Sequence, residues 1–176
     1  MDALSPVDAL TKRELEVMDR VDKVVGTIEA KFDHLRENGT FAESASIHAA
    51  YVDLAAAPAK NLEALKRAVF IGWYEQSEPG CFTGIRDLDE TQVKRAHELL
   101  EATWAAGKLD REFQVMLGWY WFHTDYLFRP YSSSAFIEYL STLHPNAYQE
   151  HGFHRNELER RGQMGRYWVS IACRAA

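Results

Sequence analysis

The sequence contains few of the residues that mark specialised protein classes. Only two of its 176 residues are cysteines, Cys81 and Cys173, and no C-x-x-C spacing joins them, so we expect free thiols. Residues 113–124 form the longest nearly uncharged stretch, which is too short to cross a bilayer, so no membrane segment is predicted. The acidic excess, 26 residues against 20 basic ones, argues against binding to nucleic acid. With an acid at Asp2 and no apolar signal segment after it, the sequence predicts a cytoplasmic protein.

Several catalytic sequence motifs are also missing. The chain has no phosphate-binding glycine loop, no dinucleotide fingerprint, no Gly-x-Ser-x-Gly turn and no cysteine zinc site. Their absence disfavours the common nucleotide-dependent enzymes and the α/β-hydrolases. We expect no cofactor, and these absences leave open whether the chain is an enzyme.

What is present is enough apolar material for one core. The chain is 47% apolar with mixed charge, and its length is that of one ordinary domain, so residues 1–176 are predicted to form a single domain. Apolar residues recur at steps of three and four, and no window alternates with period two. The sequence therefore predicts an all-α protein of seven or eight helices.

Start and stop signals divide the chain into helical segments. Ser5 followed by Pro6 is typical of a helix start, and an apolar stripe then predicts one long helix over residues 12–38. Later signals predict two helical hairpins, at 41–76 and 89–128, and C-terminal helices within 133–174. Gly162 and Gly165 predict a bend or break in the last segment.

A short motif occurs twice with the same spacing. Residues 71–74, Ile-Gly-Trp-Tyr, correspond to Leu-Gly-Trp-Tyr at 117–120, an offset of 46 residues that lies in the range of HEAT-like helical repeats. The two hairpins are therefore either a duplicated unit or two amphipathic hairpins that are similar by chance. In either case Gly72 and Gly118 predict close approach of a crossing helix.

Residues 111–128 contain the highest density of aromatic side chains. On a helix these side chains would point around the whole circumference, which predicts a helix buried on all sides. His123 and Asp125 would be buried with it. Asp125 is four residues from Arg129, so an ion pair along the helix is expected. His123 has no such partner, and it is either a core histidine or the acid or base of a pocket.

The connection at 77–89 is long for a compact domain, and long connections are often functional. Three apolar residues are predicted to anchor it to the core, and five others are candidates to face a ligand. The anchors are Phe82, Ile85 and Leu88, and the candidates are Glu78, Cys81, Thr83, Arg86 and Asp87. The sequence does not distinguish a lid from a structural connector.

A histidine-rich stretch near the C-terminus is a weak candidate for a metal site. His151 and His154 are three residues apart, and Glu157 continues the same helical face, which would suit zinc. The stretch lacks the zincin and diiron patterns, so a solvated polar face is the main interpretation and no metal is expected.

The leading functional hypothesis is a non-catalytic interaction or regulatory module that binds a protein or peptide. Its groove is predicted between the paired hairpins, bordered by the 77–89 loop and lined by Trp73, Cys81, Arg86, Trp119 and Trp121.

The alternative is a small-ligand binder or an enzyme that uses a buried pocket. His123 would act as acid or base, Asp125 or Glu75 would orient it, and Arg86 would hold an anionic group. Convergence of Glu75, Arg86 and His123 on one cavity would favour this alternative, and their dispersal would favour the interaction module. A third hypothesis is a homodimer formed through the stripe of the 12–38 helix.

Overall fold

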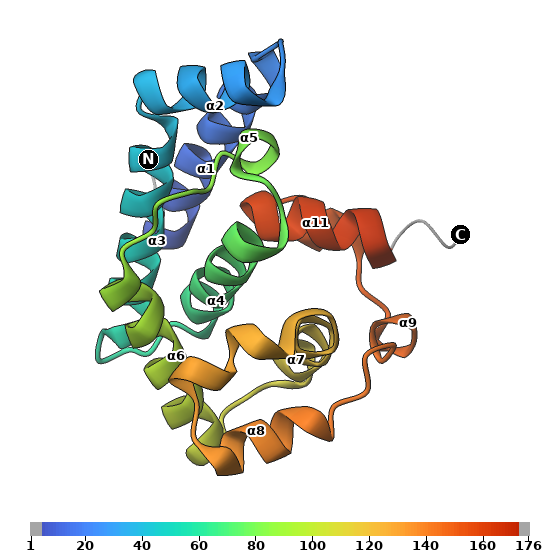
Figure 1. Cartoon of the computed structure of the whole chain (residues 1–176). Coiled ribbons are helices and arrows are strands. Elements are labelled where there is room, and N and C mark those ends of the chain that lie inside the picture. The colour runs from blue at the N-terminus through green and yellow to red at the C-terminus, as the bar shows by residue number, and fades with distance from the viewer. Residues whose placement is uncertain (1–4, 173–176) are drawn as a thin grey trace.

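The computed structural model describes residues 5–172, and every regular element in that range is a helix, with no strand (Figure 1). This confirms the all-α prediction, with more and shorter helices than expected. The α-helices are α1 (Pro6–Lys23), α2 (Ile28–Glu37), α3 (Thr40–Ala56), α4 (Leu62–Ser77), α5 (Gly80–Thr83), α6 (Glu90–Ala105), α7 (Arg111–Thr124), α8 (Ser134–Ser141), α9 (Tyr148–His151), α10 (Arg155–Leu158) and α11 (Gly162–Ala172). Two 3-10 turns, η1 (Asp125–Leu127) and η2 (Arg129–Tyr131), follow α7. Cys81 is a buried free thiol, whereas Cys173 lies outside the described residues.

The predicted long helix at 12–38 is wrong, because the chain forms α1 and α2 with a break between them. Helix α1 begins at Pro6 with Ser5 as its N-cap, as the sequence indicates. It ends at Lys23, and Gly26 then adopts a φ of 125°, a conformation that favours glycine. The hydroxyl of Thr27 accepts the N–H of Ala30 at 3.3 Å and starts α2 in a new direction. The apolar residues therefore do not form one continuous helical face. The surface through which the homodimer was predicted to form is interrupted.

The C-terminal region is also divided more finely than expected. Residues 133–172 form four helices, two of them a single turn long. Gly152 and Gly162 both have left-handed φ values, 72° and 57°, so each marks a change of chain direction. The predicted break at Gly162 is confirmed, since α11 begins there.

Helix α4 lies in the middle of the molecule and organises the packing. Helix α3 packs along it, α1 packs on α3, and α6 contacts both α3 and α4 (Figure 1). The core contains large side chains from α3, α4, α7 and α11, all with no more than 1% of their surface exposed. They include Tyr51, Phe70, Phe113, Tyr120 and Trp168. This arrangement leaves one side of α4 to be covered by the 77–89 connection and by the turns after α7.

The aromatic segment at 111–128 is not buried on all sides. Helix α7 is mostly buried as far as Tyr120, but Phe122 is 65% exposed and His123 is exposed. The helix ends at Thr124, and η1 and η2 continue the chain, because Pro130 has no N–H to extend a helical ladder. Helix α7 therefore projects its last turn beyond the core.

The second predicted hairpin, 89–128, does not form as a packed pair. Helix α6 packs on α3 and α4, whereas α7 packs on α8 and α9. The N-terminus of α7 is held to α4 instead, because the ammonium of Lys66 contacts both Asp110 and Glu112 at 2.7 Å. The offset of 46 residues is therefore not matched by two equivalent hairpins.

The two glycines of the repeated motif have different surroundings. A Cβ placed on Gly118 would lie 3.0 Å from the carbonyl oxygen of His144, so this position needs glycine for the close approach of the chain after α8. A Cβ on Gly72 would have its nearest neighbours at 3.9 Å. Close approach is therefore found at Gly118, where a turn and not the predicted crossing helix comes near, and it is absent at Gly72.

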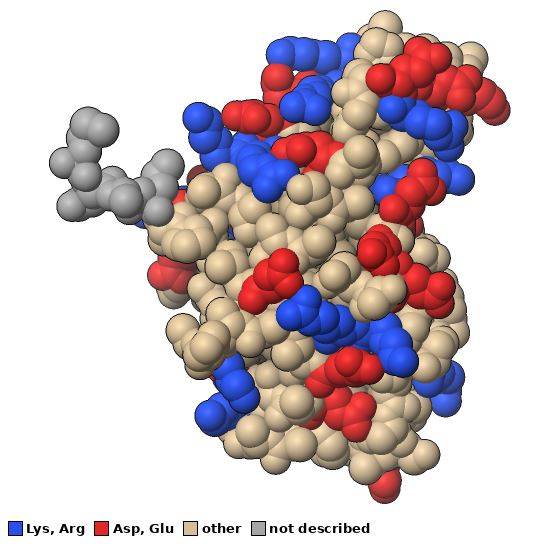
Figure 2. Space-filling model, turned by 90° about the vertical axis from the view of Figure 1, so that its left-hand side faces the viewer, with Lys and Arg blue, Asp and Glu red and all other residues tan. Residues whose placement is uncertain are grey.

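Charged side chains are mixed on the face that Figure 2 draws, which is the left-hand side of Figure 1. Basic and acidic groups lie next to one another there. Arg95 of α6 and Asp53 of α3 form one ion pair that links neighbouring helices, at 2.6 Å. Among residues 5–172, no helix has the length and apolar content that a membrane crossing requires.

Candidate functional site

A cleft of about 1010 Å³ opens along one side of α4. Its walls come from the C-terminal half of α4, the 77–89 connection, the first turns of α6, and η1 with η2. Phe32 of α2 lines one end and Tyr131 of η2 lines another part. The lining therefore comes both from α2, at the top of Figure 1, and from α6, which lies lower in that view.

The 77–89 connection forms an ordered wall of this cleft. Gly80 starts the short helix α5, and a Cβ there would lie 2.7 Å from the carbonyl oxygen of Ile85, so the turn closes tightly on itself. Ile85 is buried and anchors the segment, as predicted. The backbone N–H of Leu88 donates to Oε1 of Glu75 at 2.9 Å, which fastens the segment to α4.

Three predictions for the connection are corrected. Phe82 is not an anchor, because 55% of its surface is exposed and it lies against the ammonium of Lys31. Cys81 and Thr83 are buried and do not line the cleft, because α5 turns both side chains toward the core. Glu78, Arg86 and Asp87 do line it, in agreement with the prediction.

A buried histidine, His97 of α6, lies in the lining of the cleft. Its ring is 5.0 Å from the ring of Tyr131 and 5.3 Å from that of Phe128, centroid to centroid. Only 8% of its surface is exposed, and within residues 5–172 its Nδ1 has no hydrogen-bond partner. A buried polar atom without a partner costs free energy, and because Nδ1 is itself inaccessible, a ligand in the cleft would meet other atoms of the His97 ring.

A second buried histidine lies just behind this part of the lining. His48 of α3 is 1% exposed, and among the described residues its ring nitrogens meet the backbone of Ala68 without regular hydrogen-bond geometry. Its Nε2 is 3.9 Å from where a Cβ on Gly72 would lie, and Gly72 itself lines the cleft. Burial lowers the pKa of both His48 and His97 from 6.5 to about 4. Both rings are therefore neutral at neutral pH.

The rest of the lining carries one cation and several acids. The carboxylates are Glu75, Glu78, Asp87 and Glu90. The guanidinium of Arg86 lies 4.7 Å from the ring centroid of Phe32 and 3.6 Å from Asp87. Asp87 has a φ of 59°, a left-handed conformation that strains most residues and that Asp tolerates better.

The structure brings together only some of the predicted catalytic residues. Glu75 and Arg86 line the cleft, but His123 does not: its ring is exposed and lies against Trp119, 4.2 Å between centroids. Asp125 forms the predicted ion pair with Arg129, with 2.9 Å between Oδ2 and Nε. His123 and Asp125 therefore do not join Glu75 in one pocket, because His123 lies on the side of α7 that faces Trp119, whereas Thr124 contacts Trp73 in the lining.

The predicted aromatic groove is corrected in the same way. Trp73 lines the cleft, and its Nε1–H donates to Thr124 at 2.6 Å, which fixes the ring. Trp119 instead donates to the hydroxyl of Tyr167 at 2.8 Å, and Trp121 lies against the guanidinium of Arg129. Neither lines the cleft, because α7 packs away from α6 rather than beside it.

The weak metal candidate is also overturned. His151 ends α9, and the left-handed turn at Gly152 separates it from His154, which precedes α10. The two histidines and Glu157 thus share no helical face. Within residues 5–172, no group of three or more histidine, cysteine or acidic side chains is placed to hold a metal ion.

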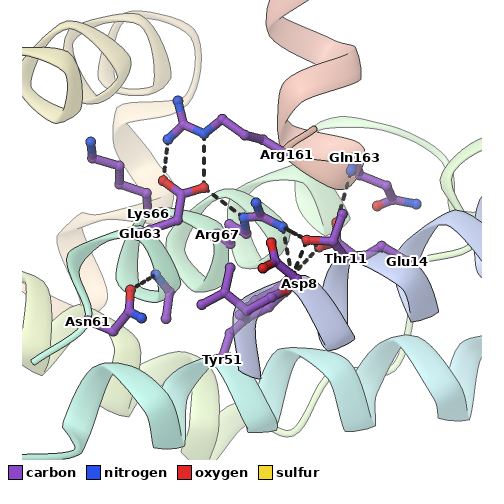
Figure 3. Close-up of polar contacts among 12 residues, drawn as sticks. Asp8, Thr11, Glu14, Tyr51, Asn61, Glu63, Lys66, Arg67, Arg161 and Gln163 are labelled. Atoms are coloured by element: carbon purple, nitrogen blue, oxygen red, sulfur yellow. Dashed lines mark hydrogen bonds and ion pairs between the residues drawn. The ribbon is translucent and has the colours of Figure 1, made fainter. Parts of the chain in front are cut away.

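A second group of buried polar side chains surrounds Arg67 (Figure 3). Glu14 accepts hydrogen bonds from the hydroxyl of Tyr51, from Arg67 at 3.3 Å and from the backbone N–H of Gln163 at 2.9 Å. Burial raises the pKa of Glu14, and the Arg67 charge opposes that rise.

The same cluster extends toward α11 through Glu63. This carboxylate accepts from Nε of Arg67 at 2.8 Å and from Nε of Arg161 at 2.9 Å. Because its buried donors and acceptors are used within the chain, the cluster ties α1, α3, α4 and the start of α11 together. We therefore treat the cluster as structural and the cleft as the candidate site.

Sequence reasoning missed His48 and His97, which are the most unusual groups near the cleft. Both lie on apolar helix faces, His48 between Ile47 and Tyr51 and His97 between Ala96 and Leu100. A histidine inside an apolar stripe was the available signal. The sequence could not show that the two faces meet beside a cavity.

The comparisons with known proteins add no family: the chain matches no protein-family model, no curated protein and no solved structure. The function is therefore argued from the cleft alone.

Proposed function

We propose that this protein binds a small organic ligand in the cleft between α4, the 77–89 connection, α6 and η2. The observation that carries the proposal is a cavity of about 1010 Å³ whose lining combines aromatic rings with Arg86, several carboxylates and the buried, neutral ring of His97. A volume of this order accommodates a small-molecule ligand, and such sites combine apolar walls with a few polar groups.

The proposal is for binding rather than catalysis. Glu75 has a structural task, since it accepts the backbone N–H of Leu88, and Trp73 is fixed by Thr124. Neither the cysteine at 81 nor the histidine at 123 reaches the cleft to supply a nucleophile or a base. We place this binding in the cytoplasm, a reducing compartment that suits the free thiol of Cys81.

A second candidate function is recognition of a peptide segment from a partner protein. The lining favours it, because it includes both Phe32 of α2 and Tyr131 of η2, and an extended peptide needs a long groove. Trp73, Arg86 and the 77–89 border of the predicted groove are all part of this cleft.

Native mass spectrometry of the untagged chain, purified gently from cells that make it, tests the proposal. Val93 lines the cleft, so Val93→Trp should fill it, whereas Val25→Trp adds the same ring at a site that is 86% exposed and outside it. We expect a defined small mass on the wild type and on Val25→Trp, and none on Val93→Trp. A bare chain in all three samples, or the same mass on Val93→Trp, would contradict the proposal. A retained polypeptide in place of a small molecule would favour the second candidate.

A further inference from the structure

The charged groups in the cleft lining come from two short segments that are joined to each other. Glu75 and Glu78 lie on and just after the last turn of α4, and Asp87 and Glu90 lie around the start of α6. The hydrogen bond from the N–H of Leu88 to Glu75, at 2.9 Å, holds the two segments together. The four carboxylates therefore come from two neighbouring segments of the lining, and those of Glu78, Asp87 and Glu90 are exposed.

These carboxylates are poorly neutralised by the protein itself. Arg86 is the one guanidinium in the lining, and it lies 3.6 Å from Asp87 and against Phe32. Within residues 5–172, Glu75, Glu78 and Glu90 take part in no ion pair. A negative potential in a partly enclosed cleft attracts cations and repels anions.

The walls near these acids are rich in aromatic rings. Trp73, Tyr126, Phe128 and Tyr131 all contribute to the lining. Aromatic faces attract cations and also pack against flat apolar groups. His97 adds a buried, neutral ring to the same lining, next to Phe128 and Tyr131.

We infer that the ligand of the cleft is an organic cation with an aromatic or apolar body, whose charged group lies among the carboxylates and whose body packs on the aromatic walls. The inference rests on the proposed ligand-binding function and narrows it. It reverses the expectation from the sequence that Arg86 would select an anionic group, because the surrounding carboxylates outnumber Arg86.

Three probes with the same indole body and different charge test the inference. They are tryptamine, a cation at neutral pH, indole-3-ethanol, which is neutral, and indole-3-acetate, an anion. Each is titrated into the full chain labelled with ¹⁵N, and binding is read from amide shifts of residues 72–80, 85–93 and 126–131. We expect tryptamine to bind about tenfold more tightly than indole-3-acetate at low salt, with indole-3-ethanol between them.

A charge-removing variant and its control show whether the carboxylates cause the preference. In the double variant Glu78→Gln with Glu90→Gln, the ratio of the two dissociation constants should fall to about threefold or less. Glu150→Gln removes an exposed carboxylate on α9, outside the cleft, and should leave the ratio unchanged. The preference should also weaken as salt is raised from about 20 mM to about 500 mM.

Different results would contradict the cation inference and the ligand-binding function. If all three probes shift the cleft residues with equal affinity, or indole-3-acetate binds best, the cation inference is overturned and the ligand-binding function stands. If none of the probes shifts these residues, the ligand-binding function is contradicted together with the inference.

Discussion

Oε1 of Glu75 accepts the backbone N–H of Leu88 at 2.9 Å, and this bond fastens the end of the 77–89 connection to the central helix. Both residues line the cleft, so the bond joins its two acidic segments. Buried Ile85 and the hydrogen bond from Ser44 to the carbonyl of Gly84, at 2.6 Å, hold the middle of the same connection.

The Glu75–Leu88 bond leads to a prediction about local opening. Glu75→Ala leaves the N–H of Leu88 without its acceptor, which costs about 1 kcal/mol locally, so exchange of that amide hydrogen should become about fivefold faster. Glu75→Gln keeps a carbonyl oxygen at the same place and should preserve the protection. Amide hydrogen exchange followed by NMR measures both, and equal exchange rates at Leu88 in the two variants would show that the bond does not hold the wall.

The two buried histidines predict acid-sensitive stability. Their pKa in the folded protein is about 4, below the ordinary 6.5, so the unfolded chain takes up these protons first as the pH falls. The folded state should therefore lose stability between pH 6.5 and pH 4, by about 3 kcal/mol for each ring, and lose no more from these groups below pH 4.

Urea unfolding at several pH values measures this loss. The double variant His48→Gln with His97→Gln should show a much flatter pH dependence over the same interval, because neither side chain titrates. The comparison concerns the slope, so a lower absolute stability of the variant does not affect it. A slope equal to that of the wild type would mean that other groups cause the acid sensitivity.

The two glycines of the repeated motif should respond in opposite directions to alanine. Gly72→Ala introduces a methyl group with ordinary spacing to its neighbours, so the helix should gain about 0.5–1 kcal/mol. Gly118→Ala places the methyl 3.0 Å from the carbonyl oxygen of His144 and should lose about 1–2 kcal/mol. Thermal unfolding of the two variants is the measurement. A loss at both positions would indicate that α4 is crossed as closely as α7.

Two arginines that both pair with acids should differ strongly in their contribution to stability. Arg67 is buried with Glu14 and Glu63, so Arg67→Ala leaves a buried carboxylate without its cation and should cost about 3–5 kcal/mol. Arg129 pairs with Asp125 on the surface, and Arg129→Ala should cost less than about 1 kcal/mol. Chemical unfolding gives both values. Similar losses would contradict the assignment of the Arg67 cluster as the polar link between the helices.

Local signals in the sequence predicted much of the secondary structure. Ser5, Asp89 and Asp110 cap the helices that follow them, since each side chain accepts a nearby backbone N–H. Such bonds form within three residues, so they can be inferred from the sequence alone. The break after Lys23 could not, because the apolar stripe continues across it and only Gly26 and Thr27 indicated the turn.

The cleft was predicted in part, and the missing part depends on tertiary packing. The 77–89 connection, Trp73, Glu75 and Arg86 were candidates, because length, aromatic content and charge are properties of the sequence. The exclusion of His123 and the presence of His97 depend on which way α7 leaves the core and on how α6 lies across α4. Neither direction is encoded in a local pattern.

The central claim is that the cleft is a binding site, and a protein-observed NMR screen with small neutral aromatic compounds tests it most directly. Spectra are recorded for the wild type, for Val93→Trp, which fills the cleft, and for Val25→Trp, which adds the same ring elsewhere. The account predicts shifts confined to residues 72–80, 85–93 and 126–131 in the wild type and in Val25→Trp, and their loss in Val93→Trp. A wild type that shows no such shifts, or a Val93→Trp variant that shows the same ones, would contradict it.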